Sequence, residues 1–289
     1  MNWSESISKA IDYIEQNLDK DISISDISKQ ACISPFYFQK GFTMICGYSV
    51  GEYIRNRRLS VAAHELLESD NKIIDIALKY GYDSPDSFTK AFTRFHGATP
   101  TLIRNKNANI KDFTPLKINL ILNGGNTIDY RIEDKESFKV IGLKRNIEYK
   151  NAYIDVEKLW KNFLIKNAFS KIKPKYGINI DVSKGNEAFD YIIGDDYNTE
   201  EKYSKKFEII EIPKFKWAVF PCKGQASISL KQTNEKIFKE WLPNNDNYEI
   251  SEGYNIEMYS NPKEYKKGLE DKNYYCEIWI PIKKIEDKT

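Results

Sequence analysis

The sequence predicts a chain of two parts, an all-α part followed by an α+β part. Three observations support this fold class. Apolar residues recur at helical spacing through residues 1–108, whereas short segments rich in β-branched and aromatic residues follow beyond them. A polar stretch without periodicity, 105–115, separates these two sequence patterns and is predicted to be a linker. The length of 289 residues suits about two domains, which we place at 1–108 and 113–289.

The first part is predicted to be a succession of helices. An apolar stripe at helical spacing marks the first helix, at 7–18. A capping-box pattern at 23–26 opens a short helix, and Ser-Pro at 34–35 opens the next, since proline is favoured at the first helical position. A longer helix is predicted over 50–67.

A repeat lies within this helical part. Each copy is a short helix, a tight turn and a second helix that starts with Ser-Pro, which is the helix-turn-helix layout. The two phenylalanines of each second helix are four residues apart and are predicted to face the core. The copies are offset by 50 residues at the matched pairs, Ser34 with Ser84, Pro35 with Pro85, Phe38 with Phe88, Lys40 with Lys90, and Phe42 with Phe92.

The opposite face of each second helix carries residues suited to reading DNA. Glutamine can bind an adenine edge, and lysine or arginine a guanine edge, in the major groove. The alternative is two ordinary helical hairpins with solvated polar faces, but the shared caps, phenylalanines and lysine favour helix-turn-helix units. The face carries Phe36, Gln39 and Lys40 in the first copy, and Asp86, Ser87, Thr89, Lys90 and Arg94 in the second.

The charge distribution agrees with a local DNA contact. The 44 basic and 42 acidic residues leave a formal charge of +2, which excludes a general polycation. Residues 53–64 nevertheless hold Arg55, Arg57 and Arg58 with no acid, and 87–111 hold five basic residues with no acid. We predict that these stretches contact phosphates, with a solvated helix face as the alternative.

Residues 7–104 resemble the DNA-binding domain of AraC/XylS-type transcription regulators. Residues 51–59 are similar to the linking helix of that family, and 73–100 to its second helix-turn-helix signature. The resemblance implies that two recognition helices enter successive major-groove segments. It also implies RNA polymerase as a partner, beside promoter DNA. Cys32 stands where the family usually has a turn glycine, and Phe36 and Asp86 are not its commonest residues, which leaves the operator sequence open.

The second part is predicted to contain two similar strand–helix–strand units. Strands are expected at 138–143, 191–193, 207–212, 217–220 and 274–282, with helices at 156–168 and 233–241. Further short matches, at 176–178 and 254–256, complete the repeat. Two such pseudo-symmetric units would pair around a twofold axis, with Asp190 and Glu277 at equivalent places.

The last strand carries an acid between two aromatic residues. Tyr275, Glu277 and Trp279 face one way because side chains alternate along a strand. Rings offer contact area and cation–π attraction, and the carboxylate offers charge, so this set suits a lipophilic cation. The alternative is an exposed acid on a half-solvated strand. The candidate ligand-binding residues are Glu277, Trp279, Tyr275, Asp190, Tyr191 and Trp217.

Residues 113–289 resemble the GyrI-like effector-binding domain, which follows an AraC-type domain in Rob-like regulators. The resemblance rests on the terminal strand, 275–282, and implies that Glu277 binds cationic lipophilic molecules, as in multidrug sensing. The predicted function is a transcription regulator that senses a small ligand. The alternatives are a hydrolase of a strained or reactive molecule that uses this pocket, and a DNA-binding protein whose second half docks a partner protein.

The sequence predicts no cofactor. Its four cysteines show no C-x-x-C spacing and only two histidines are present, which argues against a zinc site and favours reduced thiols. No membrane helix or signal peptide is expected, and the predicted location is the cytoplasm. Ligand identity, the direction of regulation and the oligomeric state stay open, since two reading helices in one chain already satisfy a two-part DNA site.

Overall fold

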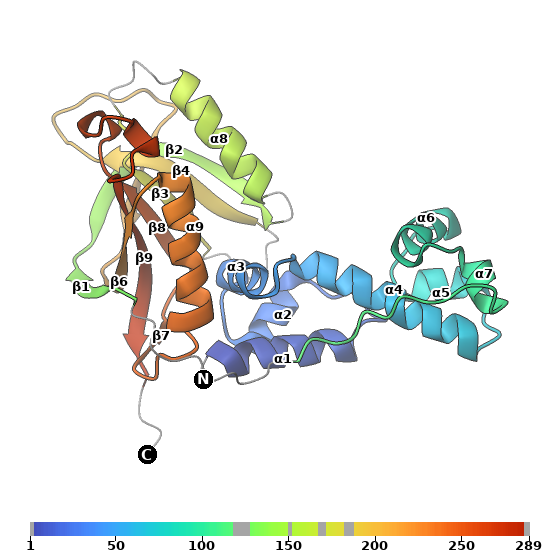
Figure 1. The fold of residues 1–289 in the computed structure, drawn as a ribbon. Helices are drawn as coiled ribbons and strands as arrows, with labels where there is room; N and C mark the ends of the chain where they lie inside the picture. Colours follow the sequence, from blue (N-terminus) through green and yellow to red (C-terminus); the bar gives the residue numbers. More distant parts are fainter. Residues whose placement is uncertain (1–2, 118–127, 150–151, 167–171, 182–187, 286–289) are drawn as a thin grey trace.

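The first third of the chain is helical and elongated. The computed structural model describes residues 3–117, 128–149, 152–166, 172–181 and 188–285. The long helix α4 connects a first group of three helices, beside the sheet, to a second group at its far end (Figure 1). The helices are α1 (Trp3–Gln16), α2 (Ile24–Ala31), α3 (Pro35–Cys46), α4 (Val50–Glu68), α5 (Ile73–Lys79), α6 (Pro85–His96) and α7 (Pro100–Arg104).

The predicted helix starts are confirmed. Ser23 forms a capping box with Asp26, and the hydroxyls of Ser34 and Ser84 accept backbone N–H groups at the starts of α3 and α6. These bonds satisfy N–H groups that have no partner within the helix. Local sequence therefore determines where the reading helices begin.

The two helix-turn-helix units share one turn geometry. Cys32 after α2 and Gly81 after α5 both have left-handed backbone, with φ of 54° and 80°. The N–H groups of Cys32 and Gly81 donate hydrogen bonds to carbonyl groups at the end of the preceding helix. The N–H group of the next residue does the same in each unit. Glycine adopts this conformation freely, whereas a residue with a Cβ atom is strained there.

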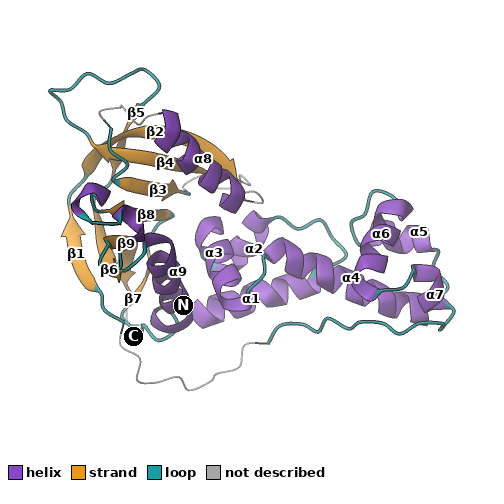
Figure 2. Ribbon diagram, turned by 45° about the horizontal axis from the view of Figure 1, so that its top comes forward, coloured by secondary structure: helices purple, strands orange, loops and turns teal. Residues whose placement is uncertain are grey.

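Among the described residues, the second part forms a nine-stranded antiparallel sheet with two α-helices, which confirms the predicted α+β class (Figure 2). The strand order is β1-β6-β9-β8-β3-β4-β2-β5, and β7 pairs with β9. In this order β2, β4 and β3 occupy places on one side of the sheet centre that correspond to those of β6, β9 and β8 on the other, and a helix follows the first strand of each set, as the predicted repeat requires. The elements are β1 (Arg131–Lys135), β2 (Phe138–Glu148), α8 (Ala152–Lys166), β3 (Tyr176–Ile180), β4 (Ala188–Asp196), β5 (Glu208–Ile212), β6 (Phe215–Lys223), α9 (Ala226–Lys236), a π-helical turn (Ile237–Trp241), β7 (Tyr248–Ile250), β8 (Tyr254–Tyr259), two 3-10 turns (Pro262–Glu264 and Gly268–Glu270) and β9 (Tyr275–Lys284).

Most predicted elements are present, with two differences. β1 and β7 were not predicted, since β1 is rich in charge and β7 is very short. The helix predicted at 233–241 begins earlier, at Ala226, and ends in the π-helical turn. The last two positions of the helix predicted at 156–168 lie outside the described residues. Within the described residues, no helix combines the length and apolarity that crossing a membrane requires.

The two faces of the sheet differ in what covers them. α8 packs on β2 and β4, and α9 on β6 and β9, all through one face. The opposite face, which we call the helix-free face, holds its own apolar cluster. Its buried members are Val140, Tyr176, Ile178, Ile192, Ile212, Trp217, Val219, Ile256 and Trp279.

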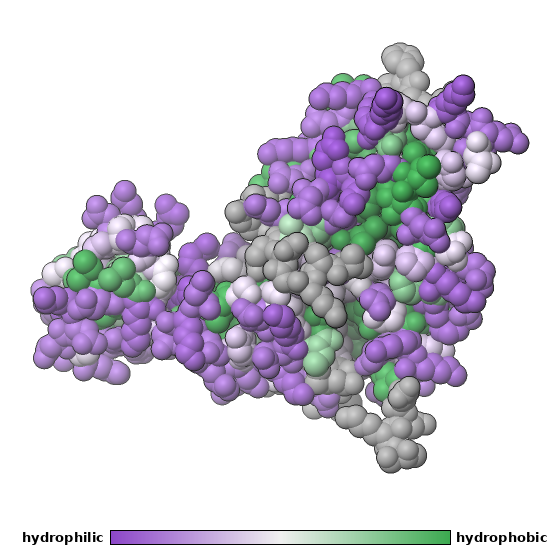
Figure 3. Space-filling model, turned by 180° about the vertical axis from the view of Figure 1, so that it is seen from behind, coloured by the Kyte–Doolittle hydropathy of each residue, from purple (hydrophilic) through white to green (hydrophobic). Residues whose placement is uncertain are grey.

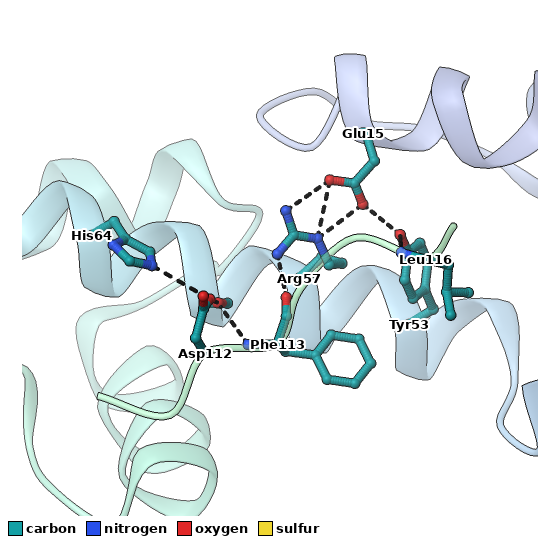
Figure 4. Close-up of polar contacts among 8 residues, drawn as sticks. Glu15, Tyr53, Arg57, His64, Asp112, Phe113 and Leu116 are labelled. Atoms are coloured by element: carbon teal, nitrogen blue, oxygen red, sulfur yellow. Dashed lines mark hydrogen bonds and ion pairs between the residues drawn. The ribbon is translucent and has the colours of Figure 1, made fainter. Parts of the chain in front are cut away.

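Packing divides the chain differently from the predicted boundary at 108–113. The core of the second helix-turn-helix unit is separate, whereas α1, α2 and α3 share one continuous core with β6, α9 and β9. The predicted linker is a loop, but it runs back along α4. The N–H of Leu116 donates to Tyr53 Oη at 3.2 Å (Figure 4). Ser60 Oγ donates to Asp112 Oδ1 at 2.6 Å.

Candidate functional sites

The second reading helix, α6, presents its predicted face to solvent. Phe88 and Phe92 are fully buried and hold the helix against α4 and α5. Four of the five candidates on the opposite side are exposed and Thr89 is half-buried. The exposed candidates are Asp86, Ser87, Lys90 and Arg94.

The first reading helix, α3, is instead covered by the sheet domain. The backbone N–H of Phe36 donates to Asp181 Oδ2 at 2.7 Å, and Lys40 Nζ donates to Asn255 Oδ1 at 3.0 Å. The Phe36 ring packs on Phe189, with centroids 5.6 Å apart. Gln39 is half-buried, and its side-chain amide donates a hydrogen bond to the carbonyl of Pro35 in the same helix. Two of the three predicted base-contact residues therefore contact protein in this arrangement.

The three arginines of α4 have different surroundings. Arg55 is exposed. Arg57 is 6% exposed, and its guanidinium binds both oxygens of Glu15 and the carbonyl of Phe113 (Figure 4). Arg58 is half-buried and donates to the carbonyl groups of Leu18 and Lys20. The geometry therefore supports a phosphate contact for Arg55 but gives Arg57 and Arg58 structural roles, because α1 folds back over α4.

The predicted acid–aromatic set is assembled on the helix-free face. Glu277 is 4% exposed, and its oxygens accept hydrogen bonds from Tyr275 Oη and Trp279 Nε1, each at 2.6 Å. Burial, and then the bond to Glu277, raise the pKa of Tyr275 to about 12, so its hydroxyl stays a donor at neutral pH. The rings of Trp217, Tyr176 and Phe138 surround Trp279 at centroid distances of 6.1, 6.2 and 6.4 Å.

Two cations of β1 complete this set, and sequence reasoning missed them. Arg131 Nη2 lies 2.9 Å from Glu277 Oε1, and Lys135 Nζ lies 4.5 Å from the centroid of the Trp279 ring. Arg131 also pairs with Glu133. The available signal was the charge alternation Arg131, Glu133, Lys135, which places all three on one side of a strand.

The other candidate ligand residues are not all in this set. Trp217 is fully buried and belongs to it through Trp279. Asp190 is on the same face but near the opposite end of the strands, where it pairs with Lys144 at 3.0 Å. Tyr191 lies on the helix-covered face, where its hydroxyl accepts from Trp160. The prediction that Tyr191 lines the site is therefore wrong in this arrangement, since it neighbours Asp190 and must face the other way.

The surface over the helix-free face is apolar. Seen from behind, the sheet domain shows a hydrophobic band with hydrophilic residues on both sides (Figure 3). Half-buried apolar residues extend the buried cluster toward solvent. They are Phe138, Ile180, Ile210, Phe215, Tyr254 and Met258.

A separate pocket lies where the helical and sheet parts meet. Its volume is about 670 Å³, and both parts contribute to its walls. The walls include Trp3, Cys32 and Ser34 from the helical part, and Asp181, Tyr248 and Glu252 from the sheet part. The pocket therefore depends on the two parts being docked.

Fold and sites together define a helix-turn-helix domain docked on an α+β sheet domain that carries a buried acid between aromatic side chains. Residues 131–282 match the family described as integron-associated effector binding protein, and 27–106 match the family described as helix-turn-helix domain. The chain belongs to the AraC-type DNA-binding transcription regulators and carries a GyrI-like effector-binding domain of the integron-associated family.

Each of three similar proteins matches only part of the chain. The HTH-type transcriptional activator AarP of Providencia stuartii is 39% identical over 114 residues, which cover 39% of this chain and 84% of AarP. Right origin-binding protein of Escherichia coli is 38% identical over 92 residues, and the match spans only 32% of its length. A solved structure described as SAV2435 bound to tetraphenylphosphonium aligns with 54% of this chain and 94% of that one, at 18% identity and a TM-score of 0.44.

Proposed function

We propose that this transcription regulator binds a small lipophilic molecule on the helix-free face, with Glu277 as its polar anchor. One observation carries the proposal: a nearly buried carboxylate is held between two aromatic side chains on a sheet face with an apolar surface (Figure 3). Aromatic rings supply contact area and attract cations, and the carboxylate supplies charge.

The two β1 cations refine the ligand class. Arg131 neutralises Glu277 and Lys135 covers the Trp279 ring, so the protein itself provides the groups that a ligand would replace. A cationic ligand competes with Arg131 for the carboxylate, and its apolar body competes with Lys135 for the ring. A diffuse charge on a large apolar body suits this exchange, because it is less hydrated than the ammonium group of lysine.

Calorimetric titration with tetraphenylphosphonium, a rigid lipophilic cation, tests this site. Glu277→Gln keeps the size of the side chain and removes its charge, and we expect it to weaken binding about tenfold or more. Glu211→Gln is the matched control, since Glu211 is an exposed acid of β5, at the sheet edge opposite β1. Unchanged affinity in Glu277→Gln would remove Glu277 from the site.

The DNA-reading residues of α6 are also proposals. Lys90 and Arg94 are exposed on α6, whose opposite face is buried through Phe88 and Phe92, which suits a base contact and a phosphate contact. Fluorescence anisotropy with promoter fragments measures this role. Lys90→Ala is expected to cost roughly 1–3 kcal/mol in specific binding. Binding of every promoter fragment only at the non-specific level would contradict the proposal.

We propose no catalytic role for the site formed by Glu277, Tyr275 and Trp279, which we call the effector site. The Glu277 carboxylate accepts bonds from Arg131 and Tyr275 at Oε1 and from Trp279 at Oε2, which holds it as a charged acceptor suited to binding a cation. AarP is described as a transcriptional activator, which agrees with a regulatory role for the DNA-binding part of the chain. Turnover of a reactive ester by the purified protein would favour the hydrolase alternative. RNA polymerase, as a further partner, stays a proposal from the family.

A further inference from the structure

We propose that the sheet domain blocks the first reading helix, α3, so that DNA and the sheet domain compete for the same residues. The inference rests on the proposed DNA-reading role of α3. It adds a closed state in which only the second helix-turn-helix unit is free to bind DNA.

We call the contact between α3 and the sheet domain the clamp. Its first part lies at the start of α3. Asp181 follows directly after β3, is 5% exposed, and accepts the N–H of Phe36, the second residue of α3. Free N–H groups at a helix N-terminus attract anions, and DNA phosphates often bind there. The Asp181 carboxylate thus occupies the position at which a phosphate would approach α3.

The second contact holds the reading face. Lys40 donates to the amide oxygen of Asn255, which is fully buried, much as it would donate to an oxygen on a guanine edge. The Phe36 ring is covered by Phe189. The amide nitrogen of Asn255 also donates to the carbonyl of Trp279 at 3.4 Å, so the clamp touches the strand that carries the effector site.

At Gly41, α3 lies close to both Trp3 of α1 and Phe238 of the sheet domain. A Cβ atom at Gly41 would lie 2.2 Å from the Trp3 ring and 3.0 Å from Phe238 of the sheet domain. The equivalent residue of the second unit is Ala91. The missing side chain lets Trp3 and Phe238 pack together over α3, with ring centroids 5.5 Å apart.

The second unit is placed differently. α6 lies at the far end of α4, away from the sheet (Figure 1). In the closed state the chain therefore reads one major-groove segment, and it reads two only after the clamp releases α3. A ligand or a DNA site that binds one state better shifts this equilibrium.

Releasing the clamp tests the inference. Asp181→Ala and Asn255→Ala remove its two hydrogen-bond acceptors without altering a reading residue, and Glu211→Ala removes an exposed acid from the far sheet edge as a charge control. The probe is a duplex enriched from a random library by the wild-type full-length chain. We expect about tenfold tighter binding by each clamp variant. We also expect hydroxyl-radical footprints that grow from one groove segment to two, while Glu211→Ala behaves as wild type.

Locking the clamp gives the converse test. Cys32 is an exposed native thiol on the wall of the pocket between the helical and sheet parts. Glu252 is an exposed residue of the sheet part that lines the same pocket. In a Cys46→Ser background, Glu252→Cys can be tethered to Cys32 with a short, reductively cleavable bis-maleimide. The tethered protein should protect one segment, and cleavage of the tether should restore the wild-type equilibrium. Protein with Cys32 alone modified is the control.

The outcomes separate this inference from the proposed function. A two-segment footprint from the tethered protein, or unchanged affinity and footprint in both well-folded clamp variants, would overturn the clamp. Absence of specific binding by the wild type, the variants and the tethered protein alike would instead overturn the DNA-reading assignment. Thermal melting of each variant verifies that it is folded.

Discussion

Arg57 of α4 and Glu15 of α1 form a forked ion pair across 42 positions of the chain. Nε of Arg57 lies 2.9 and 3.0 Å from the two carboxylate oxygens, and Nη2 lies 2.8 Å from Oε2. Tyr53 donates to the same carboxylate at 2.6 Å, and Arg57 also holds the carbonyl of Phe113. One side chain thereby connects the first helix, the long helix and the returning loop.

Arg57→Ala is expected to destabilise the fold by about 3 kcal/mol, because it removes a buried guanidinium and leaves the half-buried Glu15 carboxylate without its cation. Denaturant unfolding measures this change. Arg55→Ala is the matched control, since Arg55 is exposed; it should change stability by less than about 0.5 kcal/mol but lower the salt slope of DNA binding by about 0.9. If Arg57→Ala is as stable as wild type and lowers the salt dependence of DNA binding, Arg57 contacts a phosphate as the sequence predicted.

Cys32→Gly is expected to raise stability by about 1 kcal/mol, because Cys32 has left-handed backbone that costs a residue with a Cβ atom 1–2 kcal/mol. Thermal melting shows the gain. Gly81→Ala is the reverse experiment and should cost more, since its Cβ atom would also lie 2.7 Å from Arg58 Nη1. Equal stability of wild type and Cys32→Gly would show that the first turn relaxes without strain.

Acid is expected to loosen the second helix-turn-helix unit through His96. Its Nδ1 accepts the N–H of Lys111 and its Nε2 contacts the carbonyl of Leu59, so the neutral ring fits this site. Burial holds the pKa of His96 below its usual value of 6.5. The neutral form therefore stabilises the fold above pH 6.5, and this contribution is lost as the pH falls from there through the folded-state pKa.

The loss should reach at most about 1.4 kcal/mol per pH unit in that window. Melting between pH 7.5 and about 5 measures it. His96→Gln, whose amide can both donate and accept, should flatten the pH profile. The same profile in wild type and His96→Gln would assign the effect to other groups.

Arg131→Ala is expected to tighten tetraphenylphosphonium binding about tenfold, because it removes the internal competitor for Glu277. Lys135→Ala should act in the same direction by uncovering the Trp279 ring. Lys216→Ala is the control, since this lysine pairs with Asp134 and lies next to β1. Calorimetry decides the question, and weaker binding by Arg131→Ala would mean that Arg131 contacts the ligand.

Much of the fold and part of the site follow from local sequence. Caps, proline positions and four-residue spacings predicted the helices, because these signals act within one helical turn. Strand alternation correctly grouped Tyr275, Glu277 and Trp279. The same rule separates Tyr191 from Asp190, yet without the sheet order neither could be assigned to a site.

The sequence by itself determined the two repeated reading helices, their caps and the acid–aromatic strand. Only the tertiary structure decided which of these groups are exposed to solvent and which contact other parts of the chain. Arg131 meets Glu277 across 146 positions, and Asp181 meets Phe36 across 145. Such pairs depend on strand order and on how the helical part docks on the sheet, which no signal within a few residues encodes. For this reason two copies of one motif have different surroundings, with α6 exposed to solvent and α3 covered by its own chain.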